Sequence, residues 1–211
     1  MKTTTLLTSV VLAATLALPA AAADLRIGLA DDPDTLDPDQ SRTFVGEIVM
    51  ASMCDKLVGI GPDATIIPQL ATEWAYAEDG MSLTMTLRKG VTFQDGSSFT
   101  AEDVVRNIER SRDLPESRRK SELTSIASVT ADAEDQVTFH LNAPDATLLA
   151  RLAARSGIMV SPEVAEEAGA KFGSEPVCIG PYKFRERVQQ ERIVLEKDPT
   201  YYAASDFHFD T

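Results

Sequence analysis

The sequence is poor in the residues that most often carry catalysis or bind metal ions. It has two cysteines and two histidines, and neither histidine, His140 or His208, stands in a metal-binding pattern such as H-E-x-x-H. The serine-hydrolase pattern G-x-S-x-G is missing as well. These absences predict a protein that is not an enzyme, with no catalytic residue, no metal site and no cofactor.

Basic residues are also scarce. Lysine and arginine together number 20 against 33 aspartates and glutamates, which gives a formal net charge of −13 at pH 7. Nucleic acid and anionic membrane surfaces repel such a chain, so the charge disfavours both as partners. One basic cluster interrupts the acidic sequence, Arg118-Arg119-Lys120.

Long hydrophobic stretches are limited to one near the N-terminus. Residues 6–18 are too few to span a bilayer. They follow a positive residue, Lys2, and precede Ala21-Ala22-Ala23. This order is typical of a secretory signal peptide. We therefore expect cleavage after Ala23 and a periplasmic chain, and the alternative is an uncleaved membrane anchor. No cysteine stands directly after the hydrophobic stretch at the expected cleavage site, which argues against a lipid anchor.

Cys54 and Cys178 make up the whole cysteine content. An even count in an exported protein favours a disulfide between them. The alternative is two buried free thiols. A bridge across so long a segment would stabilise the fold by about 4–5 kcal/mol at most on the chain-entropy argument.

The hydrophobic pattern indicates a mixed α/β protein. Alternation of apolar and polar residues predicts strands, and apolar residues three and four apart predict helices. The predicted strands cover 25–30, 73–77, 83–87 and 137–141, with a hairpin over 182–196 that turns near Gln189-Gln190. The predicted helices cover 43–57, a segment capped by Thr100, and a short segment that begins at Ser161-Pro162.

Several motifs in fixed order resemble one protein family. The run LTMTLRKGVTFQDGSSFTAEDV, residues 83–104, resembles the signature of the family 5 extracellular solute-binding proteins, which are periplasmic peptide-, glutathione- and nickel-type receptors of ABC importers. The other matching stretches are DDPDTLDP, MCDKLVGI, PQLATEW, MVSPEVAEEAG, GPYKF and RIVLEKDPTYY. One local departure is Cys178-Ile179, which stands where many members have Gly-Thr.

The resemblance implies a fold and its division. The expected fold is the type II periplasmic-binding-protein-like α/β fold of cluster C. Residues 24–60 would form a first-lobe segment, 61–170 an inserted α/β subdomain, and 171–211 a return to the first lobe. Members of the family are much longer and build a second lobe from later residues. The chain is therefore expected to be the N-terminal part of a receptor, with an incomplete ligand lobe.

The resemblance also implies a function. Such a receptor captures a small peptide or a similar polar solute and delivers it to the permease and ATPase of an ABC importer. Because a solute is held between two lobes, this chain alone is expected to bind weakly or not at all. A vestigial product without ligand binding is an alternative.

Candidate solute contacts are loop residues and arginines. A helix N-terminus can meet a carboxylate, and arginine pairs carboxylates through two hydrogen bonds. The first candidates are Thr35, Leu36, Arg42, Thr43 and Phe44, and the second are Arg118, Arg119 and Arg155. The competing interpretation is a solvated turn, a helix cap and surface charges.

One enzyme pattern remains as an alternative. Ser117-Arg118-Arg119-Lys120 satisfies S-x-x-K, the nucleophile motif of penicillin-recognising enzymes. Neither S-D-N nor K-T-G follows it in the chain. A secreted serine hydrolase using Ser117 and Lys120 is therefore the alternative function, and it rests on a weak motif.

Overall fold

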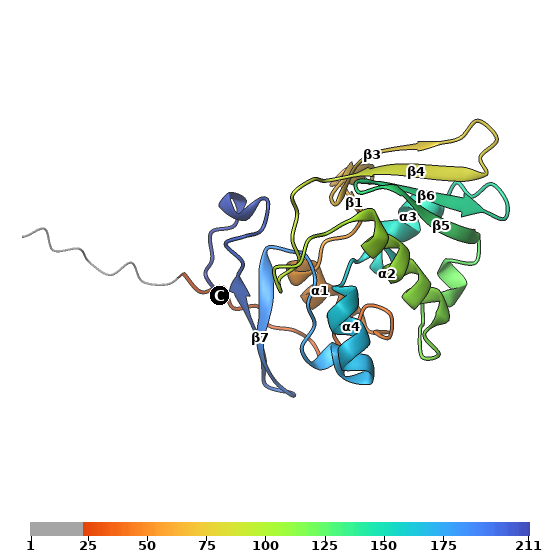
Figure 1. Ribbon diagram of the computed structural model, residues 1–211. Helices are drawn as coiled ribbons and strands as arrows, with labels where there is room; N and C mark the ends of the chain where they lie inside the picture. The colour runs from red at the N-terminus through yellow and green to blue at the C-terminus, as the bar shows by residue number, and fades with distance from the viewer. Residues whose placement is uncertain (1–22) are drawn as a thin grey trace, which may run out of the picture.

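The computed structural model describes residues 23–211 (Figure 1). The predicted signal peptide lies outside this range except for Ala23. The helices are α1 (Phe44–Met53), α2 (Ala101–Asp113), α3 (Leu148–Leu152) and α4 (Pro162–Ala168). The strands are β1 (Val58–Ile60), β2 (Ile66–Pro68), β3 (Ala71–Tyr76), β4 (Ser82–Leu87), β5 (Ile126–Ala133), β6 (Gln136–Leu141), β7 (Tyr182–Val188) and β8 (Arg192–Lys197). The mixed α/β class is as predicted.

A four-stranded antiparallel sheet in the order β3-β4-β6-β5 forms the largest layer. In β4 the side chains of Leu83, Met85 and Leu87 are buried, while Thr84 and Thr86 lie on the opposite face. The alternation of apolar and polar residues in the sequence therefore corresponds to one buried face and one more exposed face of the strand. The β3–β4 hairpin was predicted correctly, and its turn uses Gly80 at a φ of +68°.

Helix α2 covers one face of this sheet and packs against β5 and β6 (Figure 1). Its start was predicted from Thr100. The hydroxyl and N–H of Thr100 both donate to the carboxylate of Asp103, which closes the helix start. Val104 and Ile108 are fully buried against the sheet. Helix α4 also begins as predicted, since the hydroxyl of Ser161 accepts from the N–H of Val164.

Two buried apolar clusters hold the chain together. The first gathers the four-stranded sheet, α2 and α3. The second gathers α1, the loop around Leu36, α4 and the segment before β7, and it includes Ala165 and Phe172. Ala165 comes from inside the predicted subdomain 61–170, whereas Ile179 of the first cluster comes from outside it. Side-chain packing thus crosses the boundaries expected at residues 61 and 170. The division of the chain at these residues stays a prediction.

The helix predicted over 43–57 ends earlier, at Met53. Cys54 is extended, and the chain continues into the short β1–β2 hairpin instead of another helical turn. The predicted apolar face is also only half buried. Val49 and Met53 enter the second cluster, while Phe44 and Ile48 are exposed.

The strand predicted over 25–30 is wrong. The segment is not part of a sheet, and all of its residues are exposed. At one end of the segment, the N–H of Leu25 donates to the carbonyl oxygen of Thr211. The predicted β7–β8 hairpin is present, but it forms a two-stranded sheet of its own. The segment 25–30 and this hairpin, both assigned to the first lobe, therefore share no sheet.

The motif stretches meet at a buried carboxylate. Asp55, two residues after α1, accepts hydrogen bonds from the hydroxyls of Tyr201 at 2.9 Å and Tyr202 at 2.6 Å. The guanidinium of Arg88 lies 4.4 Å from the ring centre of Tyr202. Burial raises the pKa of Asp55, against the hydrogen bonds of both tyrosines. These contacts fasten the segment after β8 to the end of α1.

Replacing Gly157 by alanine should destabilise the junction between the two clusters. A Cβ at Gly157 would stand 1.8 Å from the carbonyl oxygen of Leu152, so the backbone must shift. We expect the free energy of unfolding to fall by about 1–3 kcal/mol. Urea unfolding measures it. Gly28→Ala, where no atom lies within 4 Å of the added Cβ, is the matched control. Equal midpoints for the two variants would contradict the prediction.

Candidate functional site

The predicted solute loop is organised around one carboxylate. Asp34 accepts hydrogen bonds from the N–H groups of Thr35 at 3.0 Å and Arg42 at 2.9 Å. It also accepts from the hydroxyls of Ser41 and Thr43, each at 3.1 Å. These four bonds tie the two ends of the loop together. The loop 34–43 is therefore a closed turn with a defined shape.

The start of α1 is already capped by the chain itself. The hydroxyl of Thr43 accepts from the N–H of Gly46 at 3.1 Å, and the same hydroxyl donates to the Asp34 carboxylate. Burial opposes ionisation of Asp34, but the hydrogen bonds from Arg42 and Thr35 outweigh it and lower the pKa of Asp34. A charged carboxylate thus stands where a ligand carboxylate was expected, and it would repel one.

A buried ion cluster holds the middle of the loop to α2. Arg110 donates to Asp37 through two bonds, at 2.7 and 3.1 Å, and also to Asp39. The Ser111 hydroxyl donates to Asp39 as well. Burial raises the pKa of Asp39, although the positive charge of Arg110 acts in the opposite direction. Burial alone would lower the pKa of Arg110, but its hydrogen bonds and charge attraction to Asp37 outweigh burial and raise that pKa. The Arg110 guanidinium also lies over the ring of Phe172.

Two of the predicted arginines converge on the loop from other segments. Arg155 donates to the carbonyl oxygen of Ser41 at 3.0 Å and pairs with Glu47 at 3.3 Å. Arg119 donates to the same carbonyl at 3.3 Å and pairs with Glu122. Their guanidinium groups are mostly engaged with the protein. They shape the loop and are poorly placed to bind a solute directly.

Exposure separates the remaining candidates. Leu36 is fully buried in the second cluster. By contrast, Phe44 is 73% exposed, the side chain of Arg42 is 67% exposed, and Arg118 is exposed. The structure therefore offers the ring of Phe44 and the guanidinium of Arg118 to solvent near the closed loop, while the exposed guanidinium of Arg42 pairs with Asp34 at 3.6 Å. Such a surface suits a solute with a carboxylate and an apolar part.

The geometry does not support the hydrolase alternative. The Ser117 hydroxyl donates to the carbonyl oxygen of Ser111 at 2.6 Å and accepts from the N–H of Arg119 at 3.0 Å. Ser117 is buried and Lys120 is exposed. Among the described residues, no hydrogen bond joins the two. Ser117 closes the turn after α2.

A large hollow lined by both apolar and charged residues lies beside the segment 24–30. Its volume is about 1220 Å³, and its lining also includes residues of β8 together with Ile48 and Phe209. The apolar side chains of Leu25, Ile27 and Leu29 are 50%, 63% and 38% exposed. The sequence did not predict this feature, because it depends on the missing sheet pairing of 25–30.

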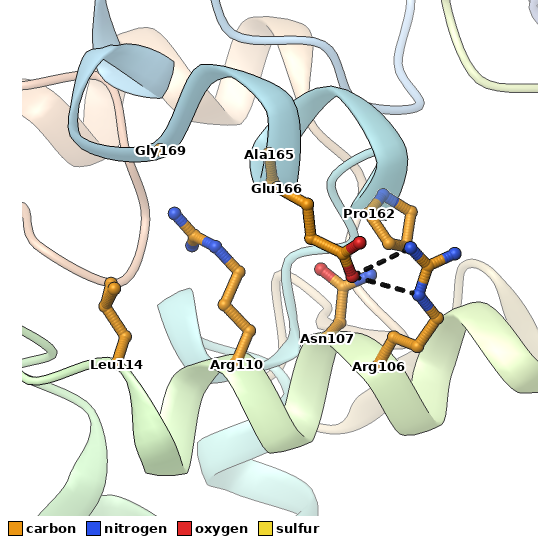
Figure 2. Close-up of a pocket in the computed structure, with 8 residues that line it drawn as sticks. All are labelled: Arg106, Asn107, Arg110, Leu114, Pro162, Ala165, Glu166 and Gly169. Atoms are coloured by element: carbon orange, nitrogen blue, oxygen red, sulfur yellow. Dashed lines mark hydrogen bonds and ion pairs between the residues drawn. The ribbon is translucent and has the colours of Figure 1, made fainter.

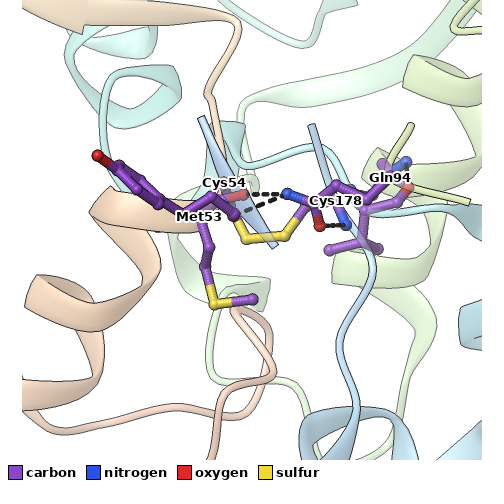
Figure 3. Close-up of a disulfide and its surroundings, with 7 residues drawn as sticks. Met53, Cys54, Gln94 and Cys178 are labelled. Atoms are coloured by element: carbon purple, nitrogen blue, oxygen red, sulfur yellow. Dashed lines mark hydrogen bonds between the residues drawn. A yellow bond between two sulfur atoms is a disulfide. The ribbon is translucent and has the colours of Figure 1, made fainter. Parts of the chain in front are cut away.

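The two cysteines are bonded in the structure (Figure 3). Their Cα atoms are 5.2 Å apart, and both side chains are buried. Gln94 sits beside the bridge and donates to the carbonyl oxygens of Met53 at 2.9 Å and Tyr182 at 3.0 Å. Its own oxygen accepts from the N–H of Cys178 at 3.1 Å. The bridge and the glutamine together join α1 to the segment before β7.

A smaller pocket of about 260 Å³ separates α2 from α4 (Figure 2). Arg106 spans it to Glu166 at 2.8 Å, and Arg110 projects from α2 into the same space. Both guanidinium groups already have carboxylate partners. The pocket therefore has no spare positive charge with which to hold an anion.

Within residues 23–211, no group of three or more acidic, histidine or cysteine side chains is arranged to hold a metal ion. In the same part of the chain, no helix has the length and apolarity needed to cross a membrane.

Sequence reasoning missed the cluster that fixes the loop. Arg110, Asp39 and Ser111 were not among the candidates, because residues about seventy positions apart carry no local pattern that pairs them. The one signal in the sequence was the Asp-rich loop itself, because closely spaced carboxylates need a positively charged partner. That signal does not say which arginine supplies it.

Comparison with known proteins identifies the family. The sequence profile of the bacterial extracellular solute-binding proteins, family 5 (middle), matches residues 65–211. The chain is 30% identical over 188 residues to the glutathione-binding protein GsiB of Salmonella choleraesuis. That match covers 88% of this chain and 37% of the relative, so the chain spans little more than a third of its relative's length.

Solved structures agree with the fold. The periplasmic binding protein DppA of Helicobacter pylori, solved with the peptide STSA, aligns with a TM-score of 0.74 and 27% identity. The alignment covers 82% of this chain and 38% of that one. AgaA of A. tumefaciens R10, solved with agropinic acid, aligns with a TM-score of 0.73 and 28% identity, covering 82% and 35%. The chain thus has part of a type II periplasmic-binding-protein fold.

Proposed function

This chain belongs to the family 5 bacterial extracellular solute-binding proteins, and on that premise we propose that it serves the capture of a small peptide or a similar polar solute for an ABC importer. A permease and an ATPase at the inner membrane would be its partners, and the periplasm its location. The observation that carries the proposal is the closed loop 34–43, which several distant segments hold in one shape beside exposed binding groups.

A preformed loop suits solute capture. Ligand sites are largely preformed, and a wall that is already ordered loses less entropy when a solute binds. Asp34 closes the loop, Arg110 fixes its middle, and Arg119 and Arg155 fix its end. None of these bonds needs a solute to form. The loop would thus present its outward side chains in the same place before and after binding.

The proposed contact set is narrower than the sequence alone suggested. Arg118 would pair with a solute carboxylate, Arg42 would do so in exchange for its exposed ion pair with Asp34, and Phe44 would cover an apolar group. Thr35 and Thr43 would contribute backbone or hydroxyl groups at the rim, whereas Leu36, Arg119 and Arg155 would support the loop from behind. Peptide-like solutes fit this chemistry, and GsiB and DppA, by their names and ligands, bind glutathione and a peptide.

Replacing Arg42 by alanine should weaken solute binding. A charge-assisted hydrogen bond contributes about 1.5–3 kcal/mol, so the dissociation constant should rise roughly ten- to hundredfold. Calorimetric titration of glutathione and of the peptide STSA into a receptor of full family length measures it. We expect residues 24–211 alone to bind these probes weakly or not at all.

The matched control is Arg185→Ala, an exposed arginine of β7. Unchanged affinity in Arg42→Ala, Arg118→Ala and Phe44→Ala together would show that the cleft lies elsewhere. Failure of every carboxylate-bearing probe to bind the unaltered receptor would contradict the proposed solute class. A vestigial product would bind nothing and would have no permease or ATPase genes beside its own.

A further inference from the structure

One arginine on α2 joins two stretches of the chain that the sequence presents separately. Arg110 lies in the helix that follows the signature run, and its guanidinium bonds to Asp37 and Asp39 in the loop after residue 30. Asp37 is fully buried and Asp39 is 4% exposed. Because a buried carboxylate needs a partner, neither aspartate can leave the guanidinium without a large loss of stability.

Asp37 also determines the course of the loop itself. Its carboxylate accepts from the N–H of Asp39 at 3.0 Å and from the side chain of Gln40 at 2.9 Å. Its backbone carbonyl accepts from the N–H of Ser41 at 2.9 Å. Asp37 is thus bonded to α2 and also fixes the backbone of the four residues that follow it. A displacement of Asp37 would be passed to Ser41, the residue that precedes Arg42.

The guanidinium geometry fits a positioning role. Arg110 uses both terminal nitrogens on Asp37 and one on Asp39, so the two carboxylates are held at fixed relative places. A planar fork of this kind fixes orientation, which a lysine ammonium does not. Arg110 also lines the pocket shown in Figure 2, but its guanidinium already pairs with Asp37 and Asp39 and is not available to an anion in that pocket.

We infer that Arg110 is a positioning residue for solute capture: it sets Asp37 and Asp39, and through them the place at which Arg42, Thr43 and Phe44 meet the solute. The binding part of this inference rests on the proposed function. The positioning part rests on contacts within residues 36–43 and α2. The two parts therefore need separate measurements.

The test uses two lysine variants on the same helix. Arg110→Lys keeps the charge but loses the fork. Arg106→Lys is the matched control, because Arg106 lies one turn earlier and also pairs with two carboxylates, Glu163 and Glu166, which are 62% and 68% exposed. Amide hydrogen exchange of the chain, followed by mass spectrometry, reports the loop 37–43 and the sheet strands β4 and β6 in one experiment.

We expect Arg110→Lys to speed exchange in peptides covering 37–43 by about tenfold or more, while β4 and β6 stay at the unaltered rate. Arg106→Lys should leave both unchanged. A purely structural role would raise all rates together through global unfolding. Parallel acceleration of the loop and the sheet, or an unchanged loop, would therefore overturn the inference.

A second variant covers the case in which Arg110→Lys does not fold. Ser111→Ala removes one hydrogen bond to Asp39 and leaves Arg110 in place. It should speed loop exchange roughly two- to tenfold, again without change in β4. An unchanged loop in Ser111→Ala would count against the inference.

The binding part is measured with glutathione and the peptide STSA in a receptor of full family length. If the unaltered receptor binds a probe, Arg110→Lys should raise its dissociation constant at least fivefold and Arg106→Lys should not. An equal dissociation constant in Arg110→Lys and the unaltered receptor would overturn the positioning role. If the unaltered receptor binds neither probe, the proposed solute class fails, and the exchange result still decides whether Arg110 positions the loop.

Discussion

Replacing Arg110 by methionine should lower the free energy of unfolding by about 3–5 kcal/mol, the loss typical of a broken buried ion pair. Methionine keeps an apolar stem over Phe172 but removes the charge. Asp37 and Asp39 would then be buried together without a cation. Two adjacent unpaired carboxylates are among the least stable arrangements in a protein interior.

Urea unfolding at pH 7 followed by circular dichroism measures this loss. Arg106→Met is the matched control, and we expect a change of at most about 1 kcal/mol because its partners are exposed. The deficit of Arg110→Met should shrink as pH falls toward 4. An acid whose pKa is raised in the folded state binds protons more readily there than in the unfolded chain, so acidification restores stability. A deficit below 1 kcal/mol at pH 7 would refute the buried-pair argument.

Removing the disulfide should cost about 4 kcal/mol, the chain-entropy value for a long closed loop. Cys54 and Cys178 are 124 residues apart in sequence, and their bond links α1 to the segment before β7. Without it, those segments are joined mainly by the second apolar cluster and by the hydrogen bonds of Gln94. We therefore expect Cys54→Ala/Cys178→Ala to unfold at a clearly lower urea concentration.

The reduced, unaltered chain separates the cross-link from the substitution. It should unfold close to the double variant, and reductant should not affect the double variant. Thiol labelling of the denatured, unreduced protein should find no free cysteine. Two labelled thiols in periplasmic material, or equal midpoints with and without reductant, would contradict the disulfide.

Local patterns predicted the local structure well. The pairing of Thr100 with Asp103 starts α2, and alternation in 83–87 marks β4, because both signals depend only on neighbouring residues. The β7–β8 hairpin was predicted for the same reason, with Gln190 in the turn at a φ of +60°. Strand β5 was missed because most of its residues are exposed, which leaves no apolar alternation to detect.

Long-range pairing was not predictable from these patterns. The 25–30 segment has the alternation of a strand, but a strand needs a neighbour to bond with, and in the chain described here a hollow lined partly by β8 lies beside it instead. The candidate site shows the same limit. Its residues stay predicted solute contacts, but Arg119 and Arg155 turn inward to a carbonyl group of the loop, which no local pattern indicates. Only the fold shows which arginines face the chain and which face solvent.

The contact between the two ends of the described chain has a consequence for biosynthesis. The Thr211 hydroxyl donates to the Asp24 carboxylate across 187 residues, and the Leu25 N–H donates to the carbonyl oxygen of Thr211. A ribosome adds about 5–20 residues per second, so the first residues of the mature chain wait roughly 10–40 s for these partners. During translation Leu25, Ile27 and Leu29 are therefore a ready target for chaperones that recognise extended apolar segments. The rate of elongation, and not only the final stability, would then influence how much of the chain reaches its folded state.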